Sequence, residues 1–275
     1  MGDSVAQEFR GDVDNMLRPR IIPCLLVHNG GLVKTRKFAD AKYVGDPINA
    51  VRIFNEKEVD ELIVADIDAT AQNREPNYAM IRNLAAECRM PLCYAGGVST
   101  PEQVERIISL GVEKVAMSSA AVSNPDVISE SARRVGNQSI VVVLDVKKVG
   151  LFRHYEVFTH NGTRKTGINP VEFAKKAESL GAGEIVVNSI DHDGVMQGYD
   201  NDVINLIRKA VSCPLTVLGG AGSMADIERL ITSHGIIGAA VGSLFVFKGK
   251  YRAVLINYPT RPDKDCLIQR AVLHK

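Results

Sequence analysis

The chain has 275 residues, of which 45% are hydrophobic and 24% charged, and its formal net charge is +1. These values are typical of a globular protein with one large core, and no apolar run is long enough for a transmembrane helix. The balanced charge and the absence of a long basic tract exclude strong nonspecific attraction to nucleic acid or to a membrane. A small anionic metabolite is the better candidate ligand.

The sequence has five cysteines and no CxxC spacing. With no signal peptide at the N-terminus, this pattern predicts reduced thiols and a cytoplasmic location. The cysteines are Cys24, Cys88, Cys93, Cys213 and Cys266.

Residues 1–16 lack hydrophobic periodicity, so we expect a flexible N-terminal extension followed by a single barrel domain over residues 17–275. Eight apolar, β-branched runs of strand length follow. Because their hydrophobicity is continuous, both faces of each strand should be buried, as in a parallel barrel wrapped by helices. The predicted strands are Ile21–Val27, Leu62–Ile67, Leu92–Ala95, Lys114–Met117, Ile140–Val146, Glu184–Ser189, Leu215–Leu218 and Ile237–Val241.

Helical patterns lie between the strands, for example over Pro101–Leu110, where Thr100 can cap the first turn and proline suits the first helical position. The connection from His28 to Gly45 is unusually long and carries Lys34 and Arg36. It follows the first strand, on the side where barrels of this kind place their active-site loops. We therefore predict that it is a lid.

Two blocks of the sequence repeat at the same distance. VDELIVADIDA, from Val59, returns as GAGEIVVNSIDHDG, which ends at Gly194. PLCYAGGVSTPEQVERIISLG, from Pro91, returns as PLTVLGGAGSMADIERLITSHG, from Pro214, and both matches lie 123 residues apart. The repeat predicts an α/β (β/α)8 TIM barrel built of two homologous half-barrels of four units each.

Glycine-rich or small-residue turns follow several strands in symmetric pairs. Such turns let a backbone approach a ligand, and helix N-termini after them bind anions. A single such turn could merely be tight, but the pairing favours two phosphate sites and a substrate with a phosphate at each end. The candidate phosphate-binding residues are Gly97, Ser118, Ser119, Gly194, Gly220, Gly242 and Ser243.

The alternation of side chains along the strands predicts which residues face the barrel interior. Four charged residues fall on its lowest layer, Arg20, Glu61, Lys114 and Glu184. Each of them could simply lie at a strand end and face solvent. Four complementary charges on one layer instead favour a closed gate or plug, since an ion-pair ring is costly to bury for structure alone.

Asp145 points inward at the top of the fifth strand, where a carboxylate can transfer a proton or hold a substrate amide. Its counterpart in the first half is Leu26. A mechanism with two carboxylates is therefore broken on that side unless His28 or Asp193 substitutes, and His28 has the opposite parity. We interpret Asp193 as a substrate contact and its neighbours Asp191 and His192 as turn residues, and we expect neither a metal site nor a cofactor.

Over residues 18–258 the sequence resembles the cyclase subunit family of imidazole glycerol phosphate synthase, a glutamine amidotransferase of histidine biosynthesis. The resemblance rests on motifs in the family's order, namely RIIPCLLVHNGGLVK, GDP at 45–47, DELIVADIDA, AGGV, KTGI at 165–168, GAGEIVVNSIDHDGVMQGYD and GGAG.

The resemblance implies a lyase subunit whose glutaminase partner docks on the N-terminal face of the barrel. Ammonia then crosses the barrel to a ribotide with two phosphates, which yields imidazole glycerol phosphate and an aminoimidazole carboxamide ribotide. It also implies that Arg20, Glu61, Lys114 and Glu184 form the ammonia gate. Lys34 would be the loop lysine that contacts substrate, and Asp145 the second catalytic aspartate.

The sequence departs from the family at Leu26, where the family has its essential first aspartate. Ser118, Asn188 and Leu218 stand where the family has asparagine, threonine and serine. Loss of an acid or base group costs about 10²–10⁴-fold in rate. The pattern is similar to diverged cyclase-like proteins of surface-polysaccharide (lipopolysaccharide) pathways, which deliver ammonia to an amidotransferase that modifies a sugar.

Three alternatives remain open at the level of the sequence. One is a conventional cyclase that uses Asp145 with a substitute base. Another is a scaffold without catalysis that binds the glutaminase and a sugar-modifying enzyme. The last is the related phosphoribosyl isomerase, which both Leu26 and the charged floor of the barrel disfavour.

Overall fold

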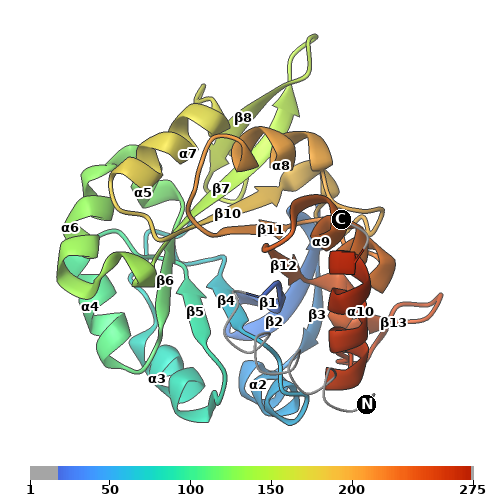
Figure 1. Ribbon diagram of the computed structural model, residues 1–275. Helices are drawn as coiled ribbons and strands as arrows, with labels where there is room; N and C mark the ends of the chain where they lie inside the picture. The colour runs from blue at the N-terminus through green and yellow to red at the C-terminus, as the bar shows by residue number, and fades with distance from the viewer. Residues whose placement is uncertain (1–17, 274–275) are drawn as a thin grey trace, which may run out of the picture.

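Eight parallel strands form a closed barrel in a computed structural model of the protein, which describes residues 18–273 (Figure 1). The predicted extension at 1–16 lies outside these residues. The sheet closes because β12 pairs with β1 and β7 pairs with β10, which confirms the predicted fold class. In order around the barrel, the strands are β1 (Arg20–His28), β4 (Leu62–Asp66), β5 (Leu92–Ala95), β6 (Lys114–Met117), β7 (Ile140–Val149), β10 (Glu184–Ser189), β11 (Leu215–Leu218) and β12 (Gly238–Val241).

Helices connect the strands and cover the outside of the barrel (Figure 1). The predicted cap of α4 is present, since Thr100 accepts a hydrogen bond from the backbone N–H of Gln103 and the Gln103 side chain accepts from that of Thr100. The helices are α2 (Pro47–Glu56), α3 (Tyr78–Glu87), α4 (Pro101–Ser109), α5 (Ser119–Ser123), α6 (Asp126–Val135), α7 (Pro170–Ser179), α8 (Asn201–Arg208), α9 (Met224–His234) and α10 (Arg261–Leu273).

The main hydrophobic core lies between the sheet and the helices, and Phe54, Tyr94 and Ile107 are fully buried in it. A second, smaller cluster fills the barrel itself. Both clusters follow from the strand sequences, because alternate residues point to the helices and to the barrel interior. No helix within residues 18–273 is long and apolar enough to cross a membrane.

Three antiparallel hairpins extend the carboxyl ends of the barrel strands. β2 (Gly31–Arg36) and β3 (Ala39–Gly45) follow β1, β8 (His154–Thr159) folds back on β7, and β13 (Phe247–Lys248) pairs with β14 (Ala253–Val254) after β12. The short β9 (Arg164–Lys165) pairs with β8. The connection between His28 and Gly45 is therefore not an open loop but a hairpin paired to β1. In both half-barrels, the first strand is followed by such a hairpin.

Candidate functional site

A ring of four charged side chains closes the N-terminal end of the barrel. The ammonium of Lys114 lies 2.9 Å from Oε2 of Glu61 and 2.8 Å from Oε2 of Glu184. Arg20 completes the ring with an ion pair to Glu61 and one of 2.7 Å to Oε1 of Glu184. The four residues that sequence parity assigns to one layer thus contact one another.

The charges of the ring stabilise one another. Burial alone would raise the pKa of Glu184, but the charges of Arg20 and Lys114 outweigh it and lower the pKa to about 2. Burial would lower the pKa of Lys114, yet its two carboxylate partners raise it. Both groups therefore stay charged at neutral pH.

Thr216 on β11 is a fifth member of the ring that the sequence analysis did not single out. Its hydroxyl donates a hydrogen bond of 2.5 Å to Oε1 of Glu184 and accepts one of 3.3 Å from Arg20. Leu218, two residues further along β11, lines the cavity at the barrel mouth, so alternation along the strand also turns Thr216 toward the interior.

Above the ring, the interior is apolar. Small and medium side chains fill the layer between the ring and the mouth of the barrel, and Leu26, Ala95, Val143 and Leu218 pack against them. Members of this column are Ile22, Cys24, Ile63, Cys93, Ala116, Val141, Val186 and Ala240. Burial raises the pKa of Cys24 to about 11, so its thiol is neutral.

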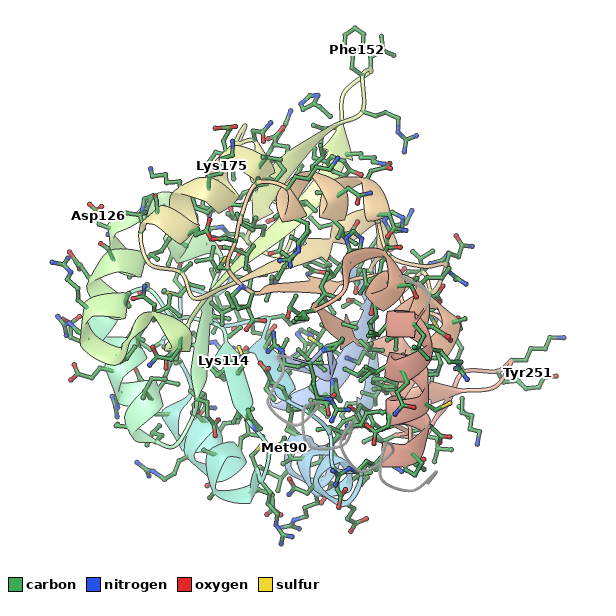
Figure 2. The ribbon with its side chains drawn as sticks, viewed as in Figure 1. Met90, Lys114, Asp126, Phe152, Lys175 and Tyr251 are labelled. Atoms are coloured by element: carbon green, nitrogen blue, oxygen red, sulfur yellow. The ribbon has the colours of Figure 1, made fainter. Side chains whose placement is uncertain are left out.

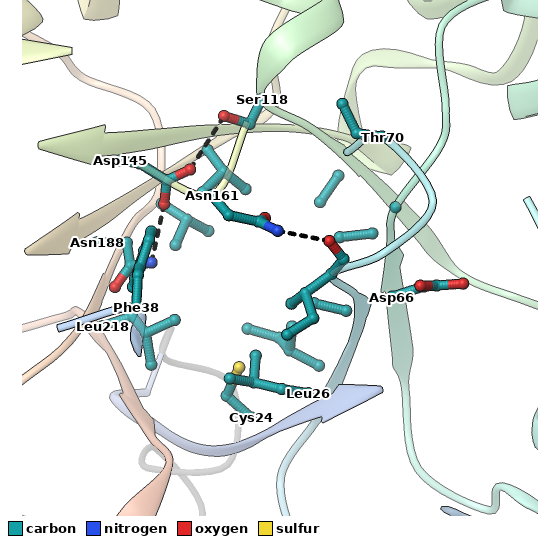
Figure 3. A pocket seen from close by; sticks show the side chains of 18 of the residues that line it. Cys24, Leu26, Phe38, Asp66, Thr70, Ser118, Asp145, Asn161, Asn188 and Leu218 are labelled. Carbon is teal, nitrogen blue, oxygen red and sulfur yellow. Dashed lines mark hydrogen bonds between the residues drawn. The ribbon is translucent and has the colours of Figure 1, made fainter. Parts of the chain in front are cut away.

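A cavity of about 190 Å³ opens at the carboxyl ends of the strands and reaches down to Cys24 and Cys93 (Figure 3). Strands, the β2–β3 hairpin and the turn after β8 all contribute to its walls. Asn161 in that turn lines the cavity and donates a hydrogen bond of 2.7 Å to the carbonyl of Ile67. Asn161 could not be found from the sequence, because it lies on a connection with no recognisable motif.

Asp145 is the carboxylate on β7 that lines this cavity. Its oxygens accept a hydrogen bond of 2.9 Å from the amide of Asn188 and one of 3.2 Å from the hydroxyl of Ser118 (Figure 3). Burial raises the pKa of Asp145 to about 6, although these two hydrogen bonds oppose the shift. A group with this pKa can exchange a proton near neutral pH.

Leu26 stands at the equivalent place in the first half-barrel. On β1 it lies opposite Ala65 of β4, whereas Asp145 on β7 lies opposite Asn188 of β10. Ala65 and Asn188 are separated by the 123 residues of the sequence repeat. Figure 3 shows Leu26 at the edge of the cavity away from Ser118. The polar pair of the second half is thus an apolar pair in the first.

Lys34 and Asp193 both line the cavity, and the β2–β3 hairpin brings them together. The ammonium of Lys34 donates to the carbonyl of Cys24, and burial lowers its pKa. Asp193 accepts hydrogen bonds of 2.7 Å from the hydroxyl of Thr35 and 3.1 Å from the backbone N–H of Phe38. Burial raises the pKa of Asp193 despite these bonds. Asp193 therefore also fastens the hairpin over the barrel.

The candidate phosphate-binding residues divide into two groups. Gly97, Ser118 and Ser119 line one side of the cavity, and Gly242 and Ser243 line another. Gly194 and Gly220 are not among the lining residues. A Cβ on either would lie 2.1 Å from a backbone carbonyl oxygen, of Thr35 or of Gly198, at positive φ. Close packing of the backbone thus accounts for these two glycines.

His28, Asp191 and His192, which the sequence also brought into question, each have a hydrogen-bond partner nearby. Nδ1 of His28 lies 2.6 Å from Oδ1 of Asp68, and His28 does not line the cavity. Asp191 accepts from the backbone N–H of Lys148 at 3.1 Å, and Nδ1 of His192 lies 2.9 Å from the hydroxyl of Ser189. Among residues 18–273, no three or more His, Cys, Asp or Glu side chains are placed to hold a metal ion.

Comparison with known sequences identifies the family. The histidine biosynthesis protein family matches this chain over residues 20–252. The chain belongs to this family. Within it, a protein of Leptospira interrogans named "Putative imidazole glycerol phosphate synthase subunit HisF" is 58% identical over 252 residues, which cover 92% of the chain and 99% of that relative.

Two further family members carry the same subunit name in numbered forms. The hisF3 protein of Vibrio vulnificus is 57% identical over 92% of the chain and 97% of its own length. The hisF2 protein of Pseudomonas aeruginosa is 52% identical over 89% of the chain and 97% of its own length. The chain is therefore a cyclase-like member of the imidazole glycerol phosphate synthase type.

Proposed function

We propose that this protein receives ammonia from a glutaminase subunit on the N-terminal face of its barrel and conducts it to the mouth. There, cyclase chemistry is altered or lost, and the ammonia serves the amidation of a surface-polysaccharide sugar by a separate amidotransferase. The observation that carries the proposal is Leu26, which replaces one of two symmetric carboxylates while the charged ring below stays complete.

The ring and the apolar column support conduction of a small neutral molecule. Four charges that hold one another across the barrel floor form a barrier whose ion pairs must separate before anything passes. The side chains of the column itself carry no ionised group, so a neutral molecule enters it at far lower cost than an ion does. Loss of the ring's function is therefore expected to affect ammonia transfer and not binding at the mouth.

The mouth supports a changed reaction. Acid–base chemistry on a ribotide would have a single carboxylate, Asp145, because Leu26 supplies none. Removal of one such group costs about 10²–10⁴-fold in rate. The candidate phosphate-binding residues that line the cavity support binding of a ligand with two phosphates. They are Gly97, Ser118 and Ser119 on one side and Gly242 and Ser243 on another.

The test follows loss of the family's ribotide substrate with excess ammonium salt and no glutaminase. We expect the native protein to show no turnover above the background of the assay. Leu26→Asp should show turnover at least 10²-fold above that background. Leu26→Asn is the matched control, since it has the shape of aspartate but does not ionise. Substantial turnover by the native protein would contradict the proposal that its chemistry is altered.

The second candidate is an active cyclase of histidine biosynthesis, which the pKa of Asp145 near 6 favours. In that case Asp145 would act with Asp193, whose carboxylate lines the same cavity. Turnover by the native protein that falls in Asp145→Asn and in Asp193→Asn would support this function. Retained turnover in Asp145→Asn would dispose of it.

Conduction is distinguished from a scaffold role by Lys114→Met. In a complex with glutaminase and the sugar amidotransferase, the variant should change the ratio of sugar amidated to glutamine hydrolysed. An unchanged ratio would favour the scaffold that only binds the two enzymes.

A further inference from the structure

We propose that three basic hairpins around the mouth of the barrel form the docking surface for the enzyme that takes the ammonia, and that this partner presents an acidic rim around an apolar cleft. We call this surface the basic crown and define it as residues 31–45, 147–154 and 247–254. The inference rests on the proposed function, because only ammonia delivered to another protein requires a partner over the mouth.

The β7–β8 hairpin ends in two large apolar side chains that contact almost nothing. Leu151 and Phe152 are each 92% exposed, and Figure 2 shows Phe152 at the end of a hairpin that extends beyond the barrel. The hairpin has no acidic residue between 147 and 154 and carries Lys147, Arg153 and Lys148, of which Lys148 is paired with Asp202 at 3.1 Å. An exposed aromatic side chain beside an arginine, as in Phe152–Arg153, is typical of a protein contact site.

The β13–β14 hairpin repeats this pattern on another side of the mouth. Tyr251 is 89% exposed, and Figure 2 shows it at the tip of the hairpin. Lys248, Lys250 and Arg252 flank it, again without an acidic residue between 247 and 254. The guanidinium of Arg252 lies 4.6 Å from the ring centre of Phe247, which stiffens the hairpin.

The β2–β3 hairpin joins the other two into one surface. The ammonium of Lys42 donates a hydrogen bond of 3.3 Å to the carbonyl of Arg252 and lies 5.0 Å from the ring centre of Phe247. On the other side, Lys37 lines a hollow together with Lys148 and Arg153, in which Asp191 and His192 also take part. Asp40 is the one acidic residue in this hairpin, against Arg36, Lys37 and Lys42 on its exposed part.

The charge of the basic crown contrasts with that of the whole chain. The chain carries 33 Lys and Arg against 32 Asp and Glu, yet the three segments of the crown contain only one acidic residue, Asp40. A local excess of this kind steers an acidic partner and sets its orientation. Phe152 and Tyr251 are suited to anchor that partner, since aromatic side chains supply much of the binding energy in protein interfaces.

The position of the crown fits shielded transfer. All three hairpins follow the carboxyl ends of barrel strands, at the end where Asp145 and the cavity lie. A protein seated on them would cover the cavity and keep ammonia from bulk water. An acidic membrane also attracts basic and aromatic side chains, but a membrane has no cleft that could accept ammonia.

The test measures binding of the sugar amidotransferase of the same cell to the complex of this protein with its glutaminase. We expect the dissociation constant to rise at least tenfold in Arg153→Glu/Lys248→Glu/Lys250→Glu and to rise steeply with salt for the native complex. Phe152→Ser/Tyr251→Ser should weaken binding by a similar factor without the change in salt dependence. The matched control, Arg82→Glu/Lys175→Glu/Lys209→Glu, reverses three exposed cations on the helical ring and should bind normally.

The outcomes separate the two proposals. If the amidotransferase binds the native complex and the crown variants bind equally well, the docking surface is wrong and the proposed function stands. If the native complex does not bind the amidotransferase at all, the proposed recipient of the ammonia is wrong, and the docking inference falls with it. Co-sedimentation with phosphatidylglycerol vesicles that depends on the crown, with no crown dependence of amidotransferase binding, would assign the surface to a membrane and overturn the inference.

Discussion

The amide of Asn188 donates a hydrogen bond of 2.9 Å to Asp145, where the equivalent pair in the other half-barrel is Ala65 and Leu26. One half of the mouth thus keeps a half-buried carboxylate with its donors, and the other half has an apolar pair at the same place. The difference makes the two halves experimentally separable by single substitutions.

Asp145→Asn should increase the free energy of unfolding at pH 7 by about 1–3 kcal/mol. The folded pKa of Asp145 is raised from 3.8 to about 6, so the ionised carboxylate destabilises the fold. The native protein should lose this stability as the pH rises from about 4 to about 6, and the variant should not. Urea unfolding at pH 4 and pH 7 measures both effects, and a native-like pH dependence in Asp145→Asn would contradict them.

Lys114→Met should lower the free energy of unfolding by about 3 kcal/mol, because it leaves Glu61 and Glu184 with Arg20 as their remaining ring cation. Lys175→Met, which removes an exposed cation, is the control and should change stability by less than about 0.5 kcal/mol.

The same ring predicts acid sensitivity. The folded pKa of Glu184 is lowered from 4.5 to about 2, so its contribution to stability is complete above pH 4.5 and is lost as the pH falls toward 2. Glu184→Gln should flatten the pH dependence of the unfolding free energy in this range. A steep loss of stability that is unchanged in the variant would show that other carboxylates control acid unfolding.

Gly220→Ala should affect stability, whereas Gly242→Ala should affect ligand binding. A Cβ on Gly220, at φ +119°, would lie 2.1 Å from the carbonyl oxygen of Gly198, so we expect destabilisation by more than about 2 kcal/mol. A Cβ on Gly242 would lie 3.4 Å from the ammonium of Lys34, which is an ordinary van der Waals contact. We therefore expect Gly242→Ala to fold normally and to weaken binding of a ligand with two phosphates. Calorimetry measures both, and a stable Gly220→Ala would be the contrary result.

The cysteines should differ widely in their rates of alkylation. Cys266 is exposed, whereas Cys93 is buried in the barrel and burial raises its pKa well above the usual value. Iodoacetamide followed by mass spectrometry should therefore modify Cys266 at least tenfold faster than Cys93 in the folded protein. Urea should remove the difference, and equal rates without urea would mean that the barrel interior is open to solvent.

Much of the barrel could be predicted from the sequence. The predicted bounds of β5, β6, β10 and β11 agree with the structure to the residue, because each strand is a short apolar run that begins either at a charged residue or directly after a proline. Alternation along the strands also predicts that Arg20 on β1 and Lys114 on β6 face the barrel interior, and both contact Glu61 there.

The hairpins could not be predicted in the same way. β2, β3 and β8 lie outside the closed barrel, so neither the repeat nor the continuous hydrophobicity of buried strands extends to them. The sequence predicts a lid in the connection from His28 to Gly45, and in the structure Thr35 and Phe38 of this connection donate hydrogen bonds to Asp193 of the other half-barrel. That contact joins positions far apart in the sequence, so no local sequence pattern predicts it.

The apolar column between the charged ring and Asp145 gives the barrel the electrical character of a thin hydrocarbon layer. Water molecules that hydrate an ion would have to be left behind at the ring, and side chains such as Val141 and Ile63 offer nothing in their place. If ammonia passes through the barrel as proposed, this column favours the neutral NH3 molecule over the ammonium ion, so the protonation state of the ammonia would decide whether it reaches the mouth.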